Sequence, residues 1–373
     1  MSKKIKTIPD YIDMVNTLTH KFKSENKIVV YRGENLDFGE TSCVPNIYRQ
    51  DVLNGNPRFE KNLFDEMTAN DLSVGGNYLE KAISAQHDGF PSRLLDVSYN
   101  CLIALYFACT PYYHKDEDEN DGKDGKVFLF AIEKMFCPTG ENIVENYNEI
   151  INANSNSFIK QQLFAKNHKL IDHIKTNKRI IAQQGAFILF QGNEYEKIPN
   201  RLIEEITIDG NSKAQLRKDL SSLFGIDTGS VYPLAENFVD KMIRRSNFVD
   251  NSLFCFENEL KMIIYNLEQD FDNYIKIISE TIKNQKIKKV IALEQLLKDY
   301  FIGIKDLKKF YIDNCNANSE NCQIFKNFIC DYNNIVSEEL DYINNMLKTQ
   351  AITIEFDDFK IIDGENYDKE REQ

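Results

Sequence analysis

The pattern of apolar and polar residues predicts a mixed α and β region over about the first 235 residues. Apolar positions recur at helical spacing over residues 9–22, 60–72 and 79–86, where we expect helices. The run CLIALYFAC, residues 101–109, is apolar on every face and predicts a buried helix capped by Asp96 or Ser98. Runs rich in β-branched and aromatic residues predict strands at 27–33, 126–133, 179–192 and 202–209.

After residue 235 the pattern becomes helical. We expect helices over 235–246, 257–286, 288–301 and 319–347, then a strand over 350–356 and an exposed, partly disordered acidic end. All eight prolines lie at or before Pro233, and only two of the sixteen glycines follow Gly229. The sequence therefore predicts an α+β domain over 1–248, with a mixed sheet and flanking helices, and a helical C-terminal domain over 249–373 with its terminal strand and acidic tail.

Composition narrows the classes of function. The chain has 373 residues, 42% of them hydrophobic, and a formal net charge of −13. Such a surface repels the nucleic-acid backbone, so affinity based on neutralising phosphates alone is not expected. The N-terminal residues lack the apolar run of a signal peptide, and no window approaches the ~18 apolar residues of a membrane span. We expect a cytoplasmic protein without a membrane partner.

Neither the cysteines nor the acidic loop predicts a metal site. The cysteines lack the short paired spacings that structural zinc needs, and we interpret them as reduced thiols, at positions 43, 101, 109, 137, 255, 315, 322 and 330. The acidic stretch 116–127 places Phe128 where a calcium loop needs its bidentate glutamate, so we interpret it as a solvated surface loop. His168 and His173 lie in a polar region without a nucleophile nearby, which favours a surface role.

The first candidate for chemistry is YRGE, residues 31–34. An arginine that closes a buried strand and precedes a glycine suits bidentate recognition of a phosphate or carboxylate. The structural alternative is an ion pair or hydrogen bond between Arg32 and Glu34 or Asp96.

The second candidate is the segment AQHDGFPSRLLDVSYN, residues 85–100. We predict that it is a linker between two helices. Pro91 restrains Phe90 to an extended conformation, so the preceding helix should end there and project Gln86 and His87 toward the turn. The same stretch holds four more candidate site residues, Ser92, Arg93, Asp96 and Asn100. Asp96 either caps the next helix or accepts hydrogen bonds from Arg32 or Arg93.

The third candidate is the segment RIIAQQGAFILFQG, with Arg179, Gln183, Gln184 and Gly185 at its start. Adjacent glutamines in a strand point to opposite faces, so one would face a cleft. Ordinary sheet-edge chemistry is the structural alternative. The sequence contains no Walker loop, GxGxxG, GxSxG or HExxH motif.

Together the ordered motifs resemble the FRG domain family over roughly residues 25–245. They are YRGE, CVPNIYR, AQHDGFPSRLLDVSYNCLIALYFA, RIIAQQGAF and KAQLRKDLSSLFGIDTGSVYPLAENF. The family's central motif, QHxGxPTRLLDWT, is matched from Gln86 to Ser98, with serine at 92 and valine at 97. Glu34 stands where a glutamine often follows the glycine.

The YRG strand is also distantly similar to the first motif of ADP-ribosyltransferases, whose arginine contacts the phosphate or ribose of NAD. This resemblance implies an ADP-ribosyltransferase-like sheet and a cleft lined by Arg32, Gln86, His87, Arg93 and Gln184. It implies catalytic roles for Arg32, His87 and Gln184, and nucleotide-binding roles for Tyr31, Gly33, Glu34, Gln86, Ser92, Arg93, Asp96, Asn100, Arg179, Gln183 and Gly185. Where those enzymes carry a glutamate, this chain has Gln183-Gln184-Gly185, with Glu194 and Glu196 nearby.

Two classes of function follow from these motifs. The first is an NAD-using ADP-ribosyltransferase or glycohydrolase, an effector of a bacterial toxin or antiphage system, with a protein or nucleic acid as acceptor and no metal cofactor. The second is a non-catalytic nucleotide or peptide sensor, in which the C-terminal helices self-associate or bind a partner protein. An RNA-acting enzyme that uses His87 is a weaker third class, because the charge and the lack of a carboxylate cluster oppose it.

Overall fold

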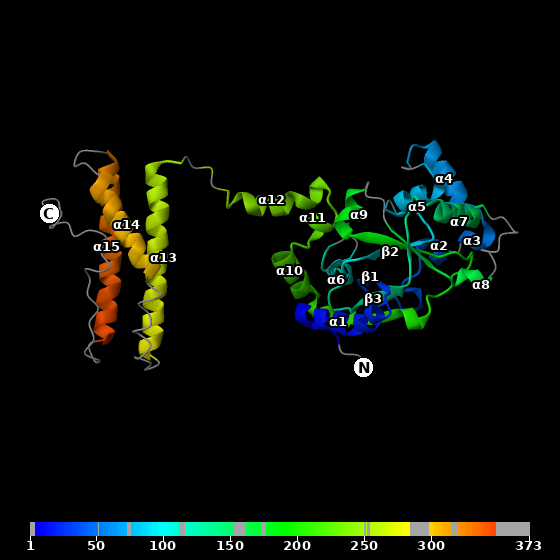
Figure 1. Ribbon diagram of the computed structural model, residues 1–373, viewed down its shortest axis with the longest axis horizontal. Coiled ribbons are helices and arrows are strands. Elements are labelled where there is room, and N and C mark those ends of the chain that lie inside the picture. The colour runs from blue at the N-terminus through cyan, green and yellow to red at the C-terminus, as the bar shows by residue number, and fades with distance from the viewer. Residues whose placement is uncertain are drawn as a thin grey trace. The chain divides into compact units, whose positions relative to one another are not determined.

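The computed structural model describes residues 4–50, 52–72, 76–87, 89–111, 116–152, 162–172, 177–249, 251, 254–283, 298–314 and 320–347. The chain divides into two compact units, Met1–Phe248 and Val249–Gln373, and each is described by itself. Figure 1 shows the sheet with its flanking helices in the first unit and helices α13, α14 and α15 in the second.

The first unit is built on one seven-stranded mixed sheet of order β4-β5-β6-β2-β1-β3-β7. Its strands are β1 Ile28–Glu34, β2 Leu94–Ser98, β3 Gly125–Ile132, β4 Met135–Phe136, β5 Lys169–Ile171, β6 Gly185–Leu189 and β7 Ile203–Ile208. The neighbours pair antiparallel except for β4 and β5, which are parallel. The mixed sheet with flanking helices confirms the predicted fold class.

Helices of very different lengths connect these strands. The longer ones in the first unit are α1 Ile8–Ser24, α4 Phe59–Ala69, α5 Tyr78–His87, α6 Cys101–Cys109, α7 Glu141–Ile151, α9 Lys178–Gln183, α10 Lys213–Phe224 and α12 Val239–Ser246. The four-residue helices are α2 Asn46–Arg49, α3 Val52–Gly55, α8 Gln162–Ala165 and α11 Thr228–Val231. Short 3-10 turns lie at Gly39–Thr41, Asn200–Leu202, Gly210–Ser212 and Ala235–Phe238.

The two faces of the sheet are covered differently. On one face, α1, α6 and α10 pack over β1, β3 and β7, while α4, α5, α7 and α9 pack over β2, β5 and β6. On the other face, Tyr48 of the short helix α2 and irregular segments that contain Cys43, Phe190 and Ile198 close the core over Val30 and its neighbours. Because side chains alternate along a strand, Arg32 and Glu34 share this second face with Val30, while Tyr31 and Gly33 face the helices.

Gly33 and Gly125 allow α6 to approach the sheet. A Cβ atom on Gly33 would lie 1.8 Å from the Ala104 carbonyl oxygen, and one on Gly125 would lie 2.2 Å from that of Ala108. Both contacts are with helix backbone, so no side-chain rotation relieves them. The glycine of the YRG motif is therefore required by packing.

Two predictions for the 85–100 segment are wrong. The stretch 94–98 is strand β2, whose apolar residues pair with β6, so the 85–100 segment contains a strand as well as a linker. The cap of α6 is Asn100, whose side-chain oxygen accepts a hydrogen bond from the Leu102 amide at 2.9 Å. Asp96 and Ser98 lie inside β2 and cannot cap this helix.

Residues 179–183, the start of the strand-bearing segment predicted over 179–192, lie in helix α9. Asn177 caps this helix by accepting a hydrogen bond from the Arg179 amide, and Gln184 ends it in the left-handed conformation at φ 47°. The strand begins only at Gly185. The expected alternation of Gln183 and Gln184 along a strand therefore does not exist.

The second unit consists of α13 Phe256–Lys283, α14 Lys298–Asn314 and α15 Glu320–Leu347, as far as it is described. Buried residues at helical spacing join them, among them Leu260, Ile264, Leu267, Phe325 and Tyr332. This confirms the helices predicted over 257–286 and 319–347. The helix predicted over 288–301 is described only from residue 298, and the strand and acidic end predicted after residue 349 lie outside the described residues.

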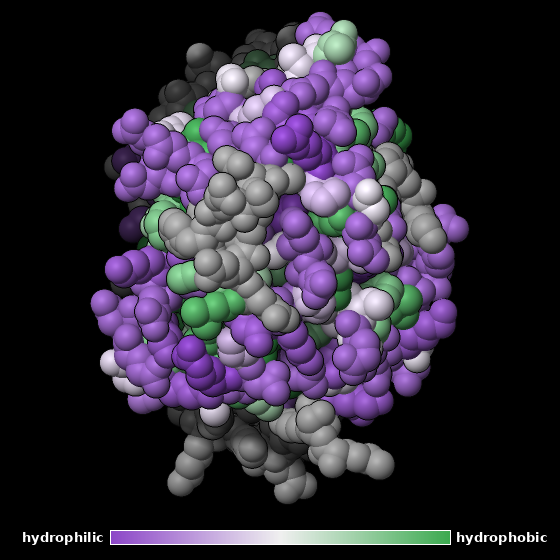
Figure 2. Space-filling view, turned by 90° about the vertical axis from the view of Figure 1, so that its right-hand side faces the viewer, coloured by the Kyte–Doolittle hydropathy of each residue, from purple (hydrophilic) through white to green (hydrophobic). Residues whose placement is uncertain are grey.

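The molecular surface is largely hydrophilic on the face shown in Figure 2, with small separate hydrophobic areas. Among the residues that the structure describes, none of the helices combines the length and the apolar character needed to cross a membrane.

Candidate functional site

Arg32 lies near the end of β1 and is held on two sides. Its Nε donates to Glu34 Oε1 at 3.0 Å, and its Nη1 donates to the Asp96 carbonyl oxygen at 2.9 Å. The side chain keeps 21% of its surface exposed. The expected pair with the Glu34 carboxylate is present, whereas Asp96 accepts through its backbone carbonyl and not through its carboxylate. The Arg32 Nη2 has no partner among the described residues. A fixed guanidinium with one free nitrogen can bind an anion without reorganising.

The strands separate at this point of the sheet. β1 pairs with β3 through seven residues, but with β2 only through Tyr31 and Ser98. Beyond that pair, the Arg32 side chain donates a hydrogen bond to the Asp96 carbonyl oxygen of β2. Arg32 therefore bridges a junction where the backbone ladder between the central strands has ended.

Glu34 is the buried anion of the site. Its side chain is 2% exposed, and its Oε1 accepts from Arg32 and from the Cys43 amide at 3.0 Å. Its Oε2 is buried and has no hydrogen-bond partner among the described groups. Because an unsatisfied buried carboxylate oxygen is costly, this atom is a natural acceptor for a ligand hydroxyl or a water.

A second arginine, Arg49, lies beside Glu34, with its Nη2 3.9 Å from Oε1. Its guanidinium is oriented by the carbonyl oxygens of Val44 and Thr41, at 2.9 and 3.0 Å. Burial lowers the pKa of Arg49, and the neighbouring charge of Arg32 lowers it further. Two cations around one carboxylate leave a local excess of positive charge in a chain of net charge −13.

Gln86 and Asp96 form a polar cluster on the helix-covered face. Gln86 Nε2 donates to Asp96 Oδ2 at 2.9 Å, and Ser92 Oγ donates to Gln86 Oε1 at 2.6 Å. The Asp96 carbonyl oxygen links this cluster to Arg32 and through it to Glu34, so five predicted site residues are connected through hydrogen bonds. His87 ends α5, but its side chain lies outside the described residues.

Arg93 does not face a cleft, and the prediction that it does is wrong. Its side chain is fully buried, and its Nε donates to Glu60 Oε2 at 2.5 Å. Its Nη1 donates to the carbonyl oxygens of Gln191 and Gly192, and Tyr147 also donates to Glu60. All three guanidinium nitrogens donate hydrogen bonds within the protein. This is expected, because a buried charge is tolerated only when it is paired and hydrogen-bonded.

The remaining predicted residues lie around the Tyr31–Ser98 pair. Ser98 Oγ donates to the Gln183 carbonyl oxygen at 2.7 Å, and Gly185 pairs with Ser98 in the sheet. Gln183 Nε2 donates to the Val231 carbonyl oxygen at 3.3 Å, and the Arg179 guanidinium lies 4.8 Å from the centre of the Tyr232 ring. These contacts hold α9 and α11 beside the sheet.

Gln184, Glu194 and Glu196 lie apart from Arg32 in the described structure. The Gln184 carbonyl oxygen accepts from the Tyr99 amide at 2.9 Å, and its side chain is exposed. Glu194 is exposed, while Glu196 lies 3.9 Å from Lys166. No contact between these three side chains and Arg32 is seen in the part of the chain that the structure describes.

Comparison with known families identifies one part of this unit. Residues 27–117 match the FRG domain, and this range contains β1, the Gln86–Asp96 cluster and α6. The chain contains an FRG domain. No curated protein and no solved structure matches the chain. Within the FRG domain, the motif residues divide into a structural set, Gly33, Arg93 and Asn100, and a set with accessible polar groups, Arg32, Gln86 and Asp96.

Sequence reasoning missed the partners that lie far away along the chain. Glu60 and Tyr147 stand in helices without a motif, and only their apolar surroundings mark them as inward-facing. Arg49 belongs to the CVPNIYR motif and could have been chosen as a site residue from it. No group of three or more His, Cys, Asp or Glu side chains suited to a metal ion occurs among the described residues.

His168 is not a surface residue, contrary to the sequence interpretation. Its ring packs on Phe190 with the ring centres 4.3 Å apart, and both nitrogens are buried. Burial lowers the pKa of His168 to about 4. The aromatic residues that surround it close the sheet face that carries Arg32.

We expect His168 to make the protein less stable in mild acid. The unfolded chain binds a proton at a pKa near 6.5, above the folded value of about 4, so stability is complete above about pH 6.5 and falls as the pH approaches 4. The loss should be on the order of 1–3 kcal/mol. Urea unfolding at several pH values should show a smaller decline for His168→Gln. Equal slopes for the two proteins between pH 4 and 6.5 would refute this assignment.

Proposed function

We propose that the FRG domain binds a nucleotide through its phosphate groups at Arg32, with NAD as the first candidate. The observation that carries the proposal is the state of the Arg32 guanidinium, which Glu34 and the Asp96 carbonyl fix while its Nη2 stays unpartnered among the described residues. Arg49 adds a second positive charge near the same oxygen, Oε1, of Glu34. Two guanidinium groups held by backbone and carboxylate contacts suit a diphosphate.

The catalytic form of the proposal is an ADP-ribosyltransferase-like effector of toxin or antiphage type. In that reaction the bond between ribose C1′ and the nicotinamide nitrogen breaks, nicotinamide leaves with the electron pair, and an acceptor or water bonds to C1′ and loses its proton. Arg32 would hold the phosphates while positive charge develops on the ribose. Glu34 Oε2 is the unpartnered carboxylate oxygen nearest to this arginine in its hydrogen-bond network, as far as the chain is described.

A second candidate function is nucleotide binding without turnover. It is favoured by the engagement of the carboxylates beside Arg32, because Glu34 supports Arg32 and Cys43 while Asp96 binds Gln86. A carboxylate that is needed to hold the site is less free to act on a substrate.

We expect Arg32→Ala to raise the dissociation constant for NAD at least about tenfold, because one charge-assisted hydrogen bond contributes more than about 1.4 kcal/mol. Arg32→Lys should keep the positive charge but lose the bidentate geometry of the guanidinium, and we therefore expect it to retain only part of the affinity. Calorimetric titration of the full chain with NAD measures both effects. Arg201→Ala, at an exposed arginine of the same unit, is the matched control.

Labelled NAD then separates the two functions. Release of nicotinamide, or transfer of label to a protein or nucleic acid in a lysate, supports the catalytic form if Arg32→Ala abolishes it. Saturable binding without turnover supports the second candidate. Absence of NAD binding by the folded protein, or equal affinity in Arg32→Ala, would overturn both.

A further inference from the structure

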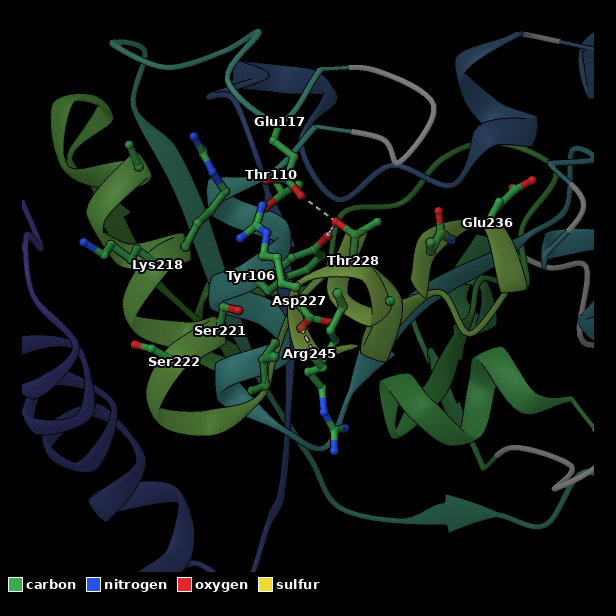
Figure 3. Close-up of a pocket in the computed structure, with 17 residues that line it drawn as sticks. Tyr106, Thr110, Glu117, Lys218, Ser221, Ser222, Asp227, Thr228, Glu236 and Arg245 are labelled. Atoms are coloured by element: carbon green, nitrogen blue, oxygen red, sulfur yellow. Dashed lines mark hydrogen bonds and ion pairs between the residues drawn. The ribbon is translucent and has the colours of Figure 1, made fainter. Parts of the chain in front are cut away.

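A separate cavity of about 900 Å³ lies in the first unit, beside the end of α6. Its walls come from the end of α6, the acidic loop that follows, α10, α11, the turn at Ala235–Phe238 and α12 (Figure 3). None of the residues proposed to bind the nucleotide lines it. Its volume falls within the ~300–1,000 Å³ typical of small-molecule sites.

The cavity collects basic side chains in an acidic protein. Five cations line it, and two of them are neutralised, since Arg217 forms a bidentate pair with Asp121 and Lys241 pairs with Asp227. The other three cations are Lys218, Arg244 and Arg245, and the described residues offer them no ion pair. Unpaired cations on two walls of one cavity, from α10 and α12, favour a ligand with more than one negative charge.

The inner part of the cavity presents hydroxyl groups and a carboxylate. Thr228 Oγ1 donates to Glu117 Oε1 at 2.7 Å, so the Tyr106 hydroxyl, 2.9 Å away, must be the donor to Thr228. Burial raises the pKa of Tyr106 to about 12, which keeps this donor protonated. Figure 3 shows Tyr106, Thr110, Glu117 and Thr228 gathered in one place.

Thr110 points to a missing partner. The residue is 4% exposed, and its Oγ1 lies near Tyr106 but makes no hydrogen bond of ordinary geometry in the described structure. A buried hydroxyl without a partner is costly, and a ligand hydroxyl in the cavity would satisfy it. This observation is independent of the charges on α10 and α12.

We propose that this cavity binds a small sugar carrying two phosphate groups. The phosphates lie against Arg244, Arg245 and Lys218, because guanidinium and ammonium groups are the usual partners of phosphate. The sugar hydroxyls bond to Thr110 Oγ1 and to the carboxylate of Glu117, which accepts hydroxyl hydrogens as it already does from Thr228. The acidic loop thereby becomes part of a binding site.

The test is calorimetric titration of the full chain with fructose 1,6-bisphosphate, inorganic pyrophosphate and fructose. We expect saturable binding of the bisphosphate, weaker binding of pyrophosphate and no binding of fructose. The double variant Arg244→Ala/Arg245→Ala should raise both dissociation constants at least about tenfold. Lys308→Ala/Lys309→Ala removes the same charge from the second unit and should change neither.

Thr110→Val tests the sugar end of the cavity. It should weaken the bisphosphate severalfold and leave pyrophosphate unchanged, while the thermal unfolding temperature without ligand stays at least as high, since the lost hydroxyl has no partner in the described structure. Absence of saturable bisphosphate binding by the wild type would overturn the proposal. Equal weakening in the lysine control would do the same, because binding would then follow overall charge. Loss of binding in Arg32→Ala would assign the ligand to the other site.

Discussion

Replacing Glu60 with alanine is expected to lower the free energy of unfolding by about 3–5 kcal/mol. The substitution leaves the Arg93 guanidinium fully buried without its counter-ion, and it removes the acceptor of both the Arg93 amide and the Tyr147 hydroxyl. An uncompensated buried charge costs more than the original pair contributed. Urea denaturation followed by circular dichroism measures the loss.

The double variant Glu60→Leu/Arg93→Met provides the decisive comparison. Removing both charges should destabilise the protein less than the sum of the two single substitutions, because neither charge is left alone. Lys61→Ala is the matched control, since this neighbouring lysine belongs to an exposed pair with Asp65 and should leave the unfolding midpoint nearly unchanged. Additive effects of the two single substitutions would show that Arg93 and Glu60 do not act as a pair.

Gly33→Ala is expected to cost about 3 kcal/mol or more, enough to prevent folding of a protein of ordinary stability. The added methyl group would overlap the Ala104 carbonyl oxygen and the Ala108 amide nitrogen, so α6 must move away from β1. That movement would open the core formed by Tyr31, Leu105 and Leu129. Thermal unfolding, or recovery in the insoluble fraction, reports the effect.

Gly55→Ala is the control for this substitution, because a methyl group on Gly55 would have nothing within 4 Å of it. Alanine there ends a short helix and should be neutral or slightly stabilising. If Gly33→Ala unfolded at the wild-type temperature, the close packing of α6 on the sheet would be incorrect, and the glycine of the YRG motif would need another explanation.

The broad architecture could be predicted because it depends on local patterns. The period of apolar residues located α1, α4, α5 and the long helices after residue 255, and the β-branched run located β1. The run at 101–109 is apolar all round and is buried, as predicted. The prediction for residues 179–183 failed because Asn177 caps a helix there, and a cap outweighs the β propensity of two isoleucines.

The site could be predicted only where its members belong to recognisable sequence motifs. Arg32, Glu34, Gln86 and Asp96 were all named, and hydrogen bonds connect them. Arg93 was assigned to the wrong environment because its partner, Glu60, lies 33 residues earlier in a helix without a motif. The burial of His168 likewise depends on Phe190, which the fold brings together with it. Pairings of this kind are set by tertiary structure.

Because β1 and β2 share one residue pair, the sheet is held together by fewer backbone contacts there than between β1 and β3. Strands β7, β3 and β1 form one ladder and β2, β6, β5 and β4 another, and the two share the Tyr31–Ser98 pair and the Arg32 side chain. A charged side chain therefore performs, at the centre of the sheet, a task that backbone hydrogen bonds perform elsewhere. An anion held at Nη2 would use the same guanidinium whose Nη1 bonds β2, so we expect binding at Arg32 to favour the arrangement in which the two ladders are joined.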